Sequence, residues 1–252
     1  MKHKTIKKRR VLNKTRKKEI KEKPWAILQY DDRGIEEMYK KVVEVNKKYC
    51  KLHGYTYIYR KDHFDLPPYW IKVKLSLDLL KTNKYKGILW MDTDAGIYDC
   101  KMTLEEFTKD TGKHFFISKD AWFDSKYKIN AGVWMVKNTA IGRNIMKAWF
   151  NKYNRDLWIK KDNKWTVDMR LPKIRRAWAI SESFEQGCFN QFIIPAYDDN
   201  IKIFPASILS HWIPSEKDGS FIGHFFKHIK TSWPAPHDAE YYIKQYLKHV
   251  CE

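Results

Sequence analysis

Residues 87–95 read GILWMDTDA, and we interpret the rest of the chain outward from this stretch. Its first five residues are typical of a buried strand, and two carboxylates, Asp92 and Asp94, follow at the end of that strand. Because side chains alternate between the two faces of a strand, both acids would point the same way. Such a pair is costly at the end of an interior strand unless a positive charge lies between them. We therefore predict a divalent cation site, with a simple Asx-type turn as the alternative.

The composition is that of a folded and basic protein. The 252 residues are 43% hydrophobic, which is enough for a sizeable core, and the formal charge is +19. Residues 1–23 hold twelve Lys or Arg and two Glu. We predict a disordered basic tail there, suited to contacting anionic surfaces, and one folded domain over residues 24–252.

Cysteine usage and hydropathy bear on where the protein works. The four cysteines are scattered and form no Cys-x-x-Cys pair, which argues against a structural zinc site and against a disulfide scaffold. No run of 18 apolar residues predicts a membrane span, and the basic N-terminus lacks the apolar segment of a signal peptide. We therefore expect a soluble, intracellular protein in a reduced, cytoplasmic setting.

Hydrophobic periodicity predicts strands that alternate with helices as far as Ala95. The predicted strands are residues 25–30, 55–59 and 87–95, and the predicted helices are residues 35–52 and 70–82. A β-α-β-α-β order with short connections is typical of an α/β protein with a mainly parallel, doubly wound sheet. Ligands of such sheets bind beyond the carboxyl ends of the strands, where Asp31, Asp92 and Asp94 would lie together.

The second half of the chain is less regular. We predict strands over residues 114–118, 129–136 and 201–204, and helices over residues 103–109, 139–153, 182–194 and 239–250. Residues 221–226 are apolar except for His224. Residues 155–180 are basic and rich in Trp, and their pattern predicts no definite element.

Five segments, in chain order, read YWIKVKLSLDLL, ILWMDTDAGI, INAGVWMVKNTAIGRNIMKAW, FEQGCFNQFI and FIGHFF. In this order they resemble the galactosyl/xylosyl/mannosyl transferase group of GT-A-fold glycosyltransferases, from about Trp25 to Phe226. The resemblance implies a GT-A (Rossmann-like) fold and a nucleotide-diphospho-sugar donor, with a UDP-sugar favoured over a GDP-sugar. It also implies a divalent metal, usually Mn²⁺, and transfer of a hexose or pentose with retention of the anomeric configuration.

The resemblance assigns roles around the metal. Asp92 and Asp94 match the Asp-x-Asp motif that binds metal and nucleotide sugar, and His224 matches a late histidine that completes the coordination. Lys72 matches a lysine near the donor diphosphate. We expect Asp94 to hold the metal directly and Asp92 to bind the ribose or a metal-bound water.

The resemblance also implies which residues bind the sugar and the nucleotide. Asn130 matches an Asn near the sugar, and Glu185 with Gln186 falls where the family usually has an Asp-Gln pair beside the anomeric carbon. The residues that would receive the base of the nucleotide end the first strand: Gln29, Tyr30 and Asp31.

The chemistry of sugar transfer is consistent with these roles. The departing diphosphate carries negative charge, so a metal ion and Lys72 beside it would lower the barrier. A mixed carboxylate and imidazole ligand set favours Mn²⁺ over Mg²⁺. Retention needs no strong base on the enzyme, and Glu185 with Gln186 could instead stabilise an oxocarbenium-like centre on the face opposite departure. The acceptor would be a hydroxyl group of a glycan, a glycoprotein or another molecule.

Two other functions are consistent with parts of the sequence. The basic tail and an aromatic surface would suit a nucleic-acid-binding protein, and Asp92 with Asp94 would suit a phosphohydrolase that uses one metal. His224 also has a structural alternative, as a hydrogen-bonded histidine of the core.

The tryptophans fall into two groups. Those on periodic elements are predicted to lie in the core: Trp70, Trp90, Trp134 and Trp149. Those in the basic and irregular region are candidates for an acceptor surface: Trp158, Trp165 and Trp178.

Overall fold

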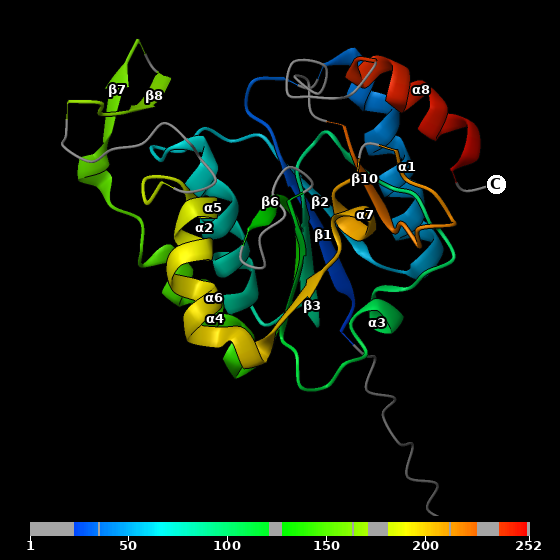
Figure 1. Ribbon diagram of the computed structural model, residues 1–252, viewed down its shortest axis with the longest axis horizontal. Helices are drawn as coiled ribbons and strands as arrows, with labels where there is room; N and C mark the ends of the chain where they lie inside the picture. The colour runs from blue at the N-terminus through cyan, green and yellow to red at the C-terminus, as the bar shows by residue number, and fades with distance from the viewer. Residues whose placement is uncertain are drawn as a thin grey trace, which may run out of the picture.

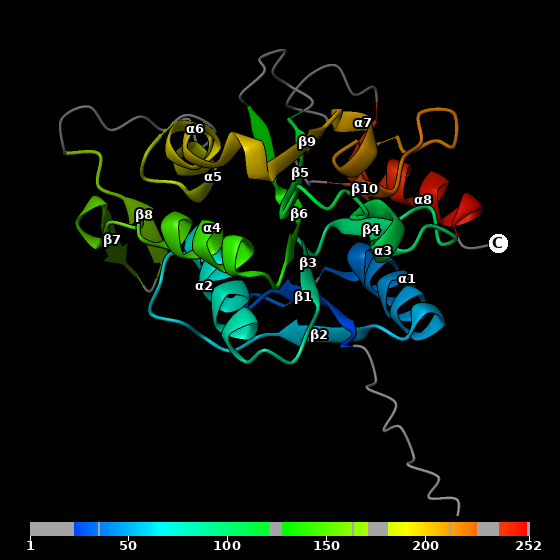
Figure 2. The same ribbon diagram turned by 90° about the horizontal axis from the view of Figure 1, so that it is seen from below.

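A computed structural model describes residues 23–34, 36–120, 128–162, 164–170, 181–211, 213–225 and 237–250. Nearly all of the predicted basic tail, and Trp178, lie outside the described residues. One twisted sheet occupies the centre, with α2, α4, α5 and α6 on one face and α1, α3, α7 and α8 on the other (Figures 1 and 2). The sheet is therefore covered on both faces, as a doubly wound α/β protein requires.

The element bounds agree with most of the predicted periodicity. The strands are β1 (Trp25–Tyr30), β2 (Thr56–Arg60), β3 (Gly87–Met91), β4 (Ala95–Ile97), β5 (Phe115–Lys119), β6 (Ile129–Lys137), β7 (Trp158–Lys161), β8 (Lys164–Val167), β9 (Ile201–Phe204) and β10 (Ile222–His224). The α-helices are α1 (Glu37–His53), α2 (Pro68–Lys81), α3 (Leu104–Phe107), α4 (Ala140–Phe150), α5 (Glu185–Cys188), α6 (Ile194–Tyr197), α7 (Ala206–Leu209) and α8 (Ala239–His249). Three further helical turns are η1 (Arg155–Leu157), η2 (Phe189–Ile193) and η3 (Asp198–Asn200).

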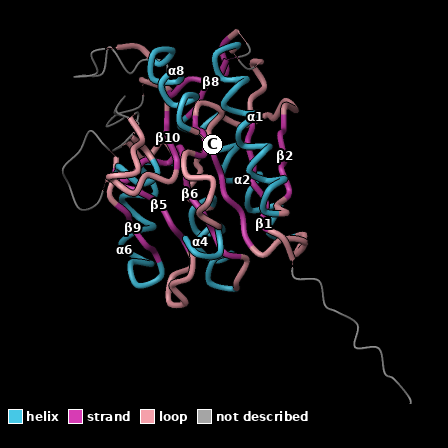
Figure 3. Tube along the Cα trace, turned by 90° about the vertical axis from the view of Figure 1, so that its right-hand side faces the viewer, coloured by secondary structure: helices cyan, strands magenta, loops and turns pink. Residues whose placement is uncertain are grey.

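The central sheet is mainly parallel, as predicted. Its strand order is β2-β1-β3-β6-β5-β9, with β2 and β9 at opposite edges (Figure 3). Strand β1 pairs in parallel with β2 and β3, and β5 pairs in parallel with β9. Strand β6 alone opposes its neighbours, β3 and β5. Because β6 is reversed, its first residues, and not its last, lie at the edge where β1 and β3 end.

The residues of β3 alternate between two core clusters. Ile88 and Trp90 pack on the face that α2 and α4 cover, whereas Leu89 and Met91 pack on the opposite face. All five residues of the strand are buried, which explains its continuous apolar sequence. The four tryptophans assigned to the core are each at most 2% exposed, so that prediction is confirmed: Trp70, Trp90, Trp134 and Trp149.

The ends of the first two helices follow from local chemistry. Gly54 adopts the left-handed conformation after α1, with φ 71°, and its N–H bonds to the carbonyl of Cys50. Helix α2 begins at Pro68, two residues before the predicted start. Proline is favoured in the first turn because no N–H is needed there and its φ is already helical.

The structure corrects several predictions in the second half. The helix expected over residues 182–194 is interrupted, because the turns of Phe189–Ile193 are π-helical. Residues 155–170 contain an unpredicted β7–β8 hairpin, which projects at the end of the molecule away from α8 (Figure 1). Trp158 is 3% exposed and packs in the core, so its assignment to an acceptor surface was wrong. Trp165 is half-buried, beneath the guanidinium of Arg155.

Two findings bear on the expected setting. No helix among the described residues is long and apolar enough to cross a membrane. Cys100 is disulfide-bonded, whereas Cys50 and Cys188 are free and buried. Disulfides are rare in reducing compartments, so Cys100 does not support the predicted reduced setting.

Candidate metal centre

The turn that follows β3 carries both acids of the Asp-x-Asp motif. Its backbone is held from three directions: the N–H of Asp92 donates to the carbonyl of Gly132, at 2.8 Å, and the N–H of Ala95 donates to the carbonyl of Asp92, at 3.0 Å. Gln29 Nε2 also donates to the carbonyl of Asp92, at 3.0 Å. The position of the turn is therefore determined by its neighbours in the sheet as well as by its own sequence.

His224 reaches the motif through a second, two-stranded sheet. Strand β10 pairs antiparallel with β4, which places His224 opposite Ala95. The N–H of Phe225 donates to the carbonyl of Asp94, at 2.8 Å, and His224 Nε2 lies 3.2 Å from Asp94 Oδ1. Gly132 makes room for the imidazole, since a Cβ there would lie 2.3 Å from His224 Cε1.

Asp92, Asp94 and His224 together form a cluster that fits a divalent cation. One ligand atom from each lies within 4.8 Å of the others. The side chains of Asp92 and Asp94 are 32% and 23% exposed, so an ion could reach them, whereas the imidazole is 7% exposed. Two carboxylates and one imidazole suit Mn²⁺ or another borderline metal and leave coordination positions for a ligand.

The electrostatics of the cluster favours a bound positive charge. Burial acts to raise the pKa of Asp94, but the adjacent His224 outweighs burial and lowers it. Burial likewise acts to lower the pKa of His224, but the Asp94 carboxylate outweighs burial and raises it. A positive charge between Asp94 and His224 is therefore favourable. Either a proton on the imidazole or a bound metal ion could supply it.

Lys72 lies between Asp92 and Glu185 and contacts both. Its Nζ donates to the two Asp92 carboxylate oxygens, at 2.9 and 3.2 Å, and lies 3.5 Å from Glu185 Oε1. Burial acts to lower the pKa of Lys72, but the two carboxylates outweigh burial and raise it. Trp90 Nε1 also donates to Asp92 Oδ1, at 2.8 Å. Asp92 is therefore bound by Lys72 and Trp90, and Asp94 by His224.

Glu185 is a buried acid at the start of α5. Its side chain is 4% exposed, and Oε2 has no hydrogen-bond partner among the described residues. Burial raises the pKa of this carboxyl to about 7, with Asp92 adding to the rise and Lys72 opposing it. A buried carboxyl oxygen without a hydrogen-bond partner lowers the stability of the fold. Such a group is more easily explained by a function, so Glu185 is a candidate functional residue.

Gln186 and Asn130 shape the first residues of β6. Gln186 Oε1 accepts from the N–H of Ala131, at 2.9 Å, and Asn130 Oδ1 accepts from the N–H of Gly132, at 2.8 Å. Gln186 Nε2 also donates to Asp120 Oδ2, at 3.3 Å. Asp120 was not singled out from the sequence, although it follows strand β5 as Asp92 follows β3. The same reasoning about strand ends could have found it.

The three residues expected to bind the base have different surroundings. Gln29 is fully buried, and its Oε1 accepts from Tyr57 and Asn46, which favours support of the motif over direct contact with a nucleotide. Tyr30 packs edge-to-face on Phe64. Asp31 forms a two-point ion pair with Arg33 and accepts from the hydroxyl of Thr93, inside the motif.

Comparisons with known proteins agree with this geometry. The galactosyl transferase GMA12/MNN10 family model matches residues 25–113, a part of the chain that holds Lys72, Asp92 and Asp94. None of the curated proteins compared with this chain matches it.

One solved glycosyltransferase has a similar fold, and two further solved structures match with lower TM-scores. One is involved in the glycosylation of the major capsid of PBCV-1; it is 14% identical, with a TM-score of 0.58, over 89% of this chain and 99% of that chain. The catalytic domain of Drosophila beta1,4galactosyltransferase 7, in complex with xylobiose, is 10% identical, with a TM-score of 0.45, over 91% of this chain and 81% of that chain. A mutant of that enzyme, in complex with manganese, UDP-Gal and xylobiose, is also 10% identical, with a TM-score of 0.42, over 85% of this chain and 76% of that chain.

The fold and the family match confirm the predicted resemblance. The chain has the mixed α/β fold of GT-A glycosyltransferases, and its Asp-x-Asp motif lies where the sheet offers a ligand site. Together these findings indicate a glycosyltransferase.

Proposed function

We propose that this protein transfers a hexose or pentose from a nucleotide-diphosphate donor to a hydroxyl acceptor, in a metal-dependent reaction with retention. A UDP-sugar is the favoured donor, and a glycan or a glycoprotein is the favoured acceptor. The observation that carries the proposal is the cluster of Asp92, Asp94 and His224, whose ligand atoms lie within 4.8 Å of one another. The cluster lies beyond the carboxyl end of β3, where doubly wound sheets bind their ligands.

Asp94 and His224 would hold the metal, with Asp92 beside it. A divalent cation bound there supplies positive charge to the diphosphate that departs. The structure supports unequal roles for the two acids, because Lys72 and Trp90 already hold the Asp92 carboxylate. Asp92 would then bind the ribose of the donor, and Lys72 would add a positive charge beside the diphosphate.

Glu185 would act at the anomeric carbon. Lys72, at 3.5 Å, favours its ionised form. An ionised carboxylate on the face opposite the departing diphosphate would stabilise the positive charge that develops at that carbon, as in retaining transfer. Gln186 and Asn130 would then position the sugar by fixing the first residues of β6, to which both side chains are bonded.

The proposal is tested with the full chain, Mn²⁺ and a panel of UDP- and GDP-sugars. The expected result is thermal stabilisation by one donor, slow donor hydrolysis in the presence of Mn²⁺, and loss of both in Asp94→Ala. Failure of every donor to bind or react would contradict the proposal. Release of phosphate without sugar transfer would favour the phosphohydrolase, and salt-dependent nucleic-acid binding that survives Asp94→Ala, without donor turnover, would favour the nucleic-acid-binding protein.

A further inference from the structure

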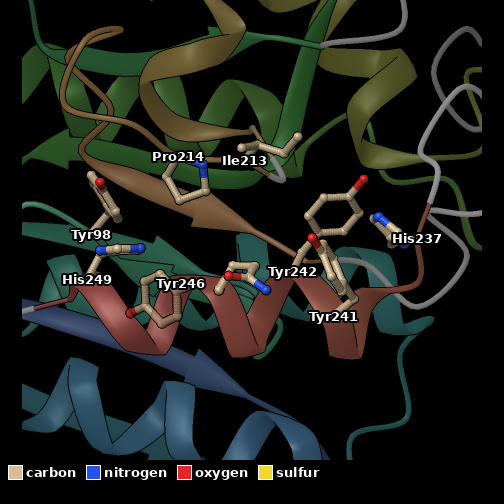
Figure 4. A pocket seen from close by; sticks show the side chains of 9 residues that line it. Tyr98, Ile213, Pro214, His237, Tyr241, Tyr242, Tyr246 and His249 are labelled. Carbon is tan, nitrogen blue, oxygen red and sulfur yellow. The ribbon is translucent and has the colours of Figure 1, made fainter.

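A cavity of about 420 Å³ lies between α8 and the segment that precedes β10 (Figure 4). One wall is a stripe of α8, because Tyr241, Gln245 and His249 recur at four-residue spacing and so share a helix face. The opposite wall is made by Ile213 and Pro214. A volume of this size is within the range of sites that bind small molecules.

The lining combines aromatic rings with phenol hydroxyls, one amide and the imidazoles of His237 and His249. Tyr98, Tyr242 and Tyr246 contribute further rings. None of the described residues that line the cavity is Lys, Arg, Asp or Glu, in a chain whose formal charge is +19. Such a surface suits a ligand with apolar faces and many uncharged hydroxyl groups, because the rings cover the C–H faces and the polar tips bond the hydroxyls. It does not suit a diphosphate, for which Arg, Lys or a metal would be needed.

The cavity is built on the same elements as the metal centre. The ring of Tyr246 packs on that of Phe225, at 5.0 Å between centroids, and Phe225 directly follows His224. The hydroxyl of Tyr246 donates to the carbonyl of Ile97 in β4, at 2.6 Å. The two-stranded sheet of β4 and β10 therefore has two roles. It places Asp94 and His224 at one end, and it contacts Tyr246, which lines the cavity.

We propose that this cavity binds a neutral glycan, as the part of the acceptor that lies away from the reacting hydroxyl. The role as an acceptor subsite rests on the proposed function, whereas the binding of a neutral glycan follows from the lining itself. Tyr241 is the best residue to test, because it is 40% exposed and its ring contacts that of His237 in a tilted arrangement, with 3.7 Å between the ring centroids. Tyr246 is a poor choice because it is 2% exposed and belongs to the core.

The experiment measures binding of named saccharides to the full chain by saturation-transfer difference NMR. The probes are cellobiose, lactose, mannobiose and xylobiose, with sialyllactose as a charged counterpart. We expect at least one neutral disaccharide to bind, and Tyr241→Ala to weaken it about tenfold, the effect of losing one aromatic contact. Lys244→Ala, an exposed change on the same helix outside the cavity, should bind as the unmodified protein does.

A further variant separates this cavity from the metal centre. Asp94→Ala should retain the binding of the disaccharide, because Asp94 does not line the cavity. The proposal is overturned if no neutral disaccharide binds, if only sialyllactose binds, if Tyr241→Ala binds normally, or if Asp94→Ala abolishes binding. Hydrolysis of a nucleotide sugar by the unmodified protein with Mn²⁺ tests the proposed function independently, so the two failures are distinguishable.

Discussion

The region from β1 to β4 and the region from α5 to β10 contribute to the same candidate site by different kinds of contact. The first supplies Asp92 and Asp94 at the end of an interior strand, inside the part of the chain that the family model matches. The second supplies Glu185 and His224 from a short helix and a three-residue strand. Pairing within the six-stranded sheet places the acids, whereas a separate two-stranded sheet places His224 and a four-residue helix places Glu185. The second region should therefore be the easier one to displace by a single change.

The largest effect is expected at the acids of the first region. Asp94→Ala should lower donor turnover with Mn²⁺ by at least about a thousandfold, because it removes a metal ligand beside the charge that develops on the diphosphate. Asp92→Ala should lower turnover less, since Lys72 and Trp90, not His224, contact that carboxylate. Steady-state kinetics over a range of Mn²⁺ concentrations measures both. Equal losses at the two positions would contradict the division of roles.

A pH-dependent effect on stability is expected at Glu185. Its pKa is about 7 in the folded protein against 4.5 for the group by itself, so the folded state holds this proton more tightly than the unfolded state. Its contribution to stability is therefore fully present below about pH 4.5 and is lost as the pH rises through about 7. Glu185→Gln removes this dependence. The unfolding free energy of the variant should therefore exceed that of the unmodified protein by an amount that grows with pH, reaching roughly 3 kcal/mol more above pH 7 than at pH 4.5.

Urea denaturation of the metal-free protein at pH 4.5 and pH 8 measures this difference. The chemically similar change Glu216→Gln, at a site where the side chain is not in the core, serves as the control. If Glu185→Gln changes the unfolding free energy by the same amount at both pH values, the carboxyl of Glu185 does not cause the pH dependence.

A smaller effect is expected where the second region meets β6. Gly132→Ala would place a Cβ 2.3 Å from His224 Cε1 and force the imidazole away from Asp94. Mn²⁺ affinity, measured by titration calorimetry, should fall about 10- to 100-fold, as it does when a ligand loses its orientation. Gly112→Ala is the matched control, because the nearest atom to its added Cβ is 3.6 Å away. Unchanged Mn²⁺ affinity in Gly132→Ala would exclude His224 as a ligand.

The smallest effect is expected at the contact between α1 and the end of β10. The hydroxyl of Tyr39 donates to the carbonyl of Phe225, at 3.0 Å. Tyr39→Phe should lower the free energy of unfolding by about 1 kcal/mol, the usual contribution of one buried hydrogen bond. Tyr59→Phe, on β2, is the control, and thermal unfolding measures both. A loss no greater than that of the control would mean that this bond does not hold β10.

Much of the first region could be predicted because its signals are local. Apolar runs that end in Asp31 and Asp92 predicted both strand ends, and Gly54 predicted the end of α1, with its left-handed φ. The β7–β8 hairpin and the π-helical turns of Phe189–Ile193 were not predicted. Their sequences lack a clear period of 2 or 3.6, and their conformation depends on packing against α2 and α4.

The sequence by itself determined that two acids leave an interior strand on the same side, because alternation along a strand is a property of the local backbone. The match of His224 to a known motif predicted its role, but only the pairing of β10 with β4 brings it to Asp94. Tertiary structure alone decided that Lys72 binds Asp92, that the reversed β6 delivers Gly132 beside His224, and that Tyr241 faces a cavity. These contacts join residues far apart in the chain, and only the packing of the whole sheet and its helices determines such distances.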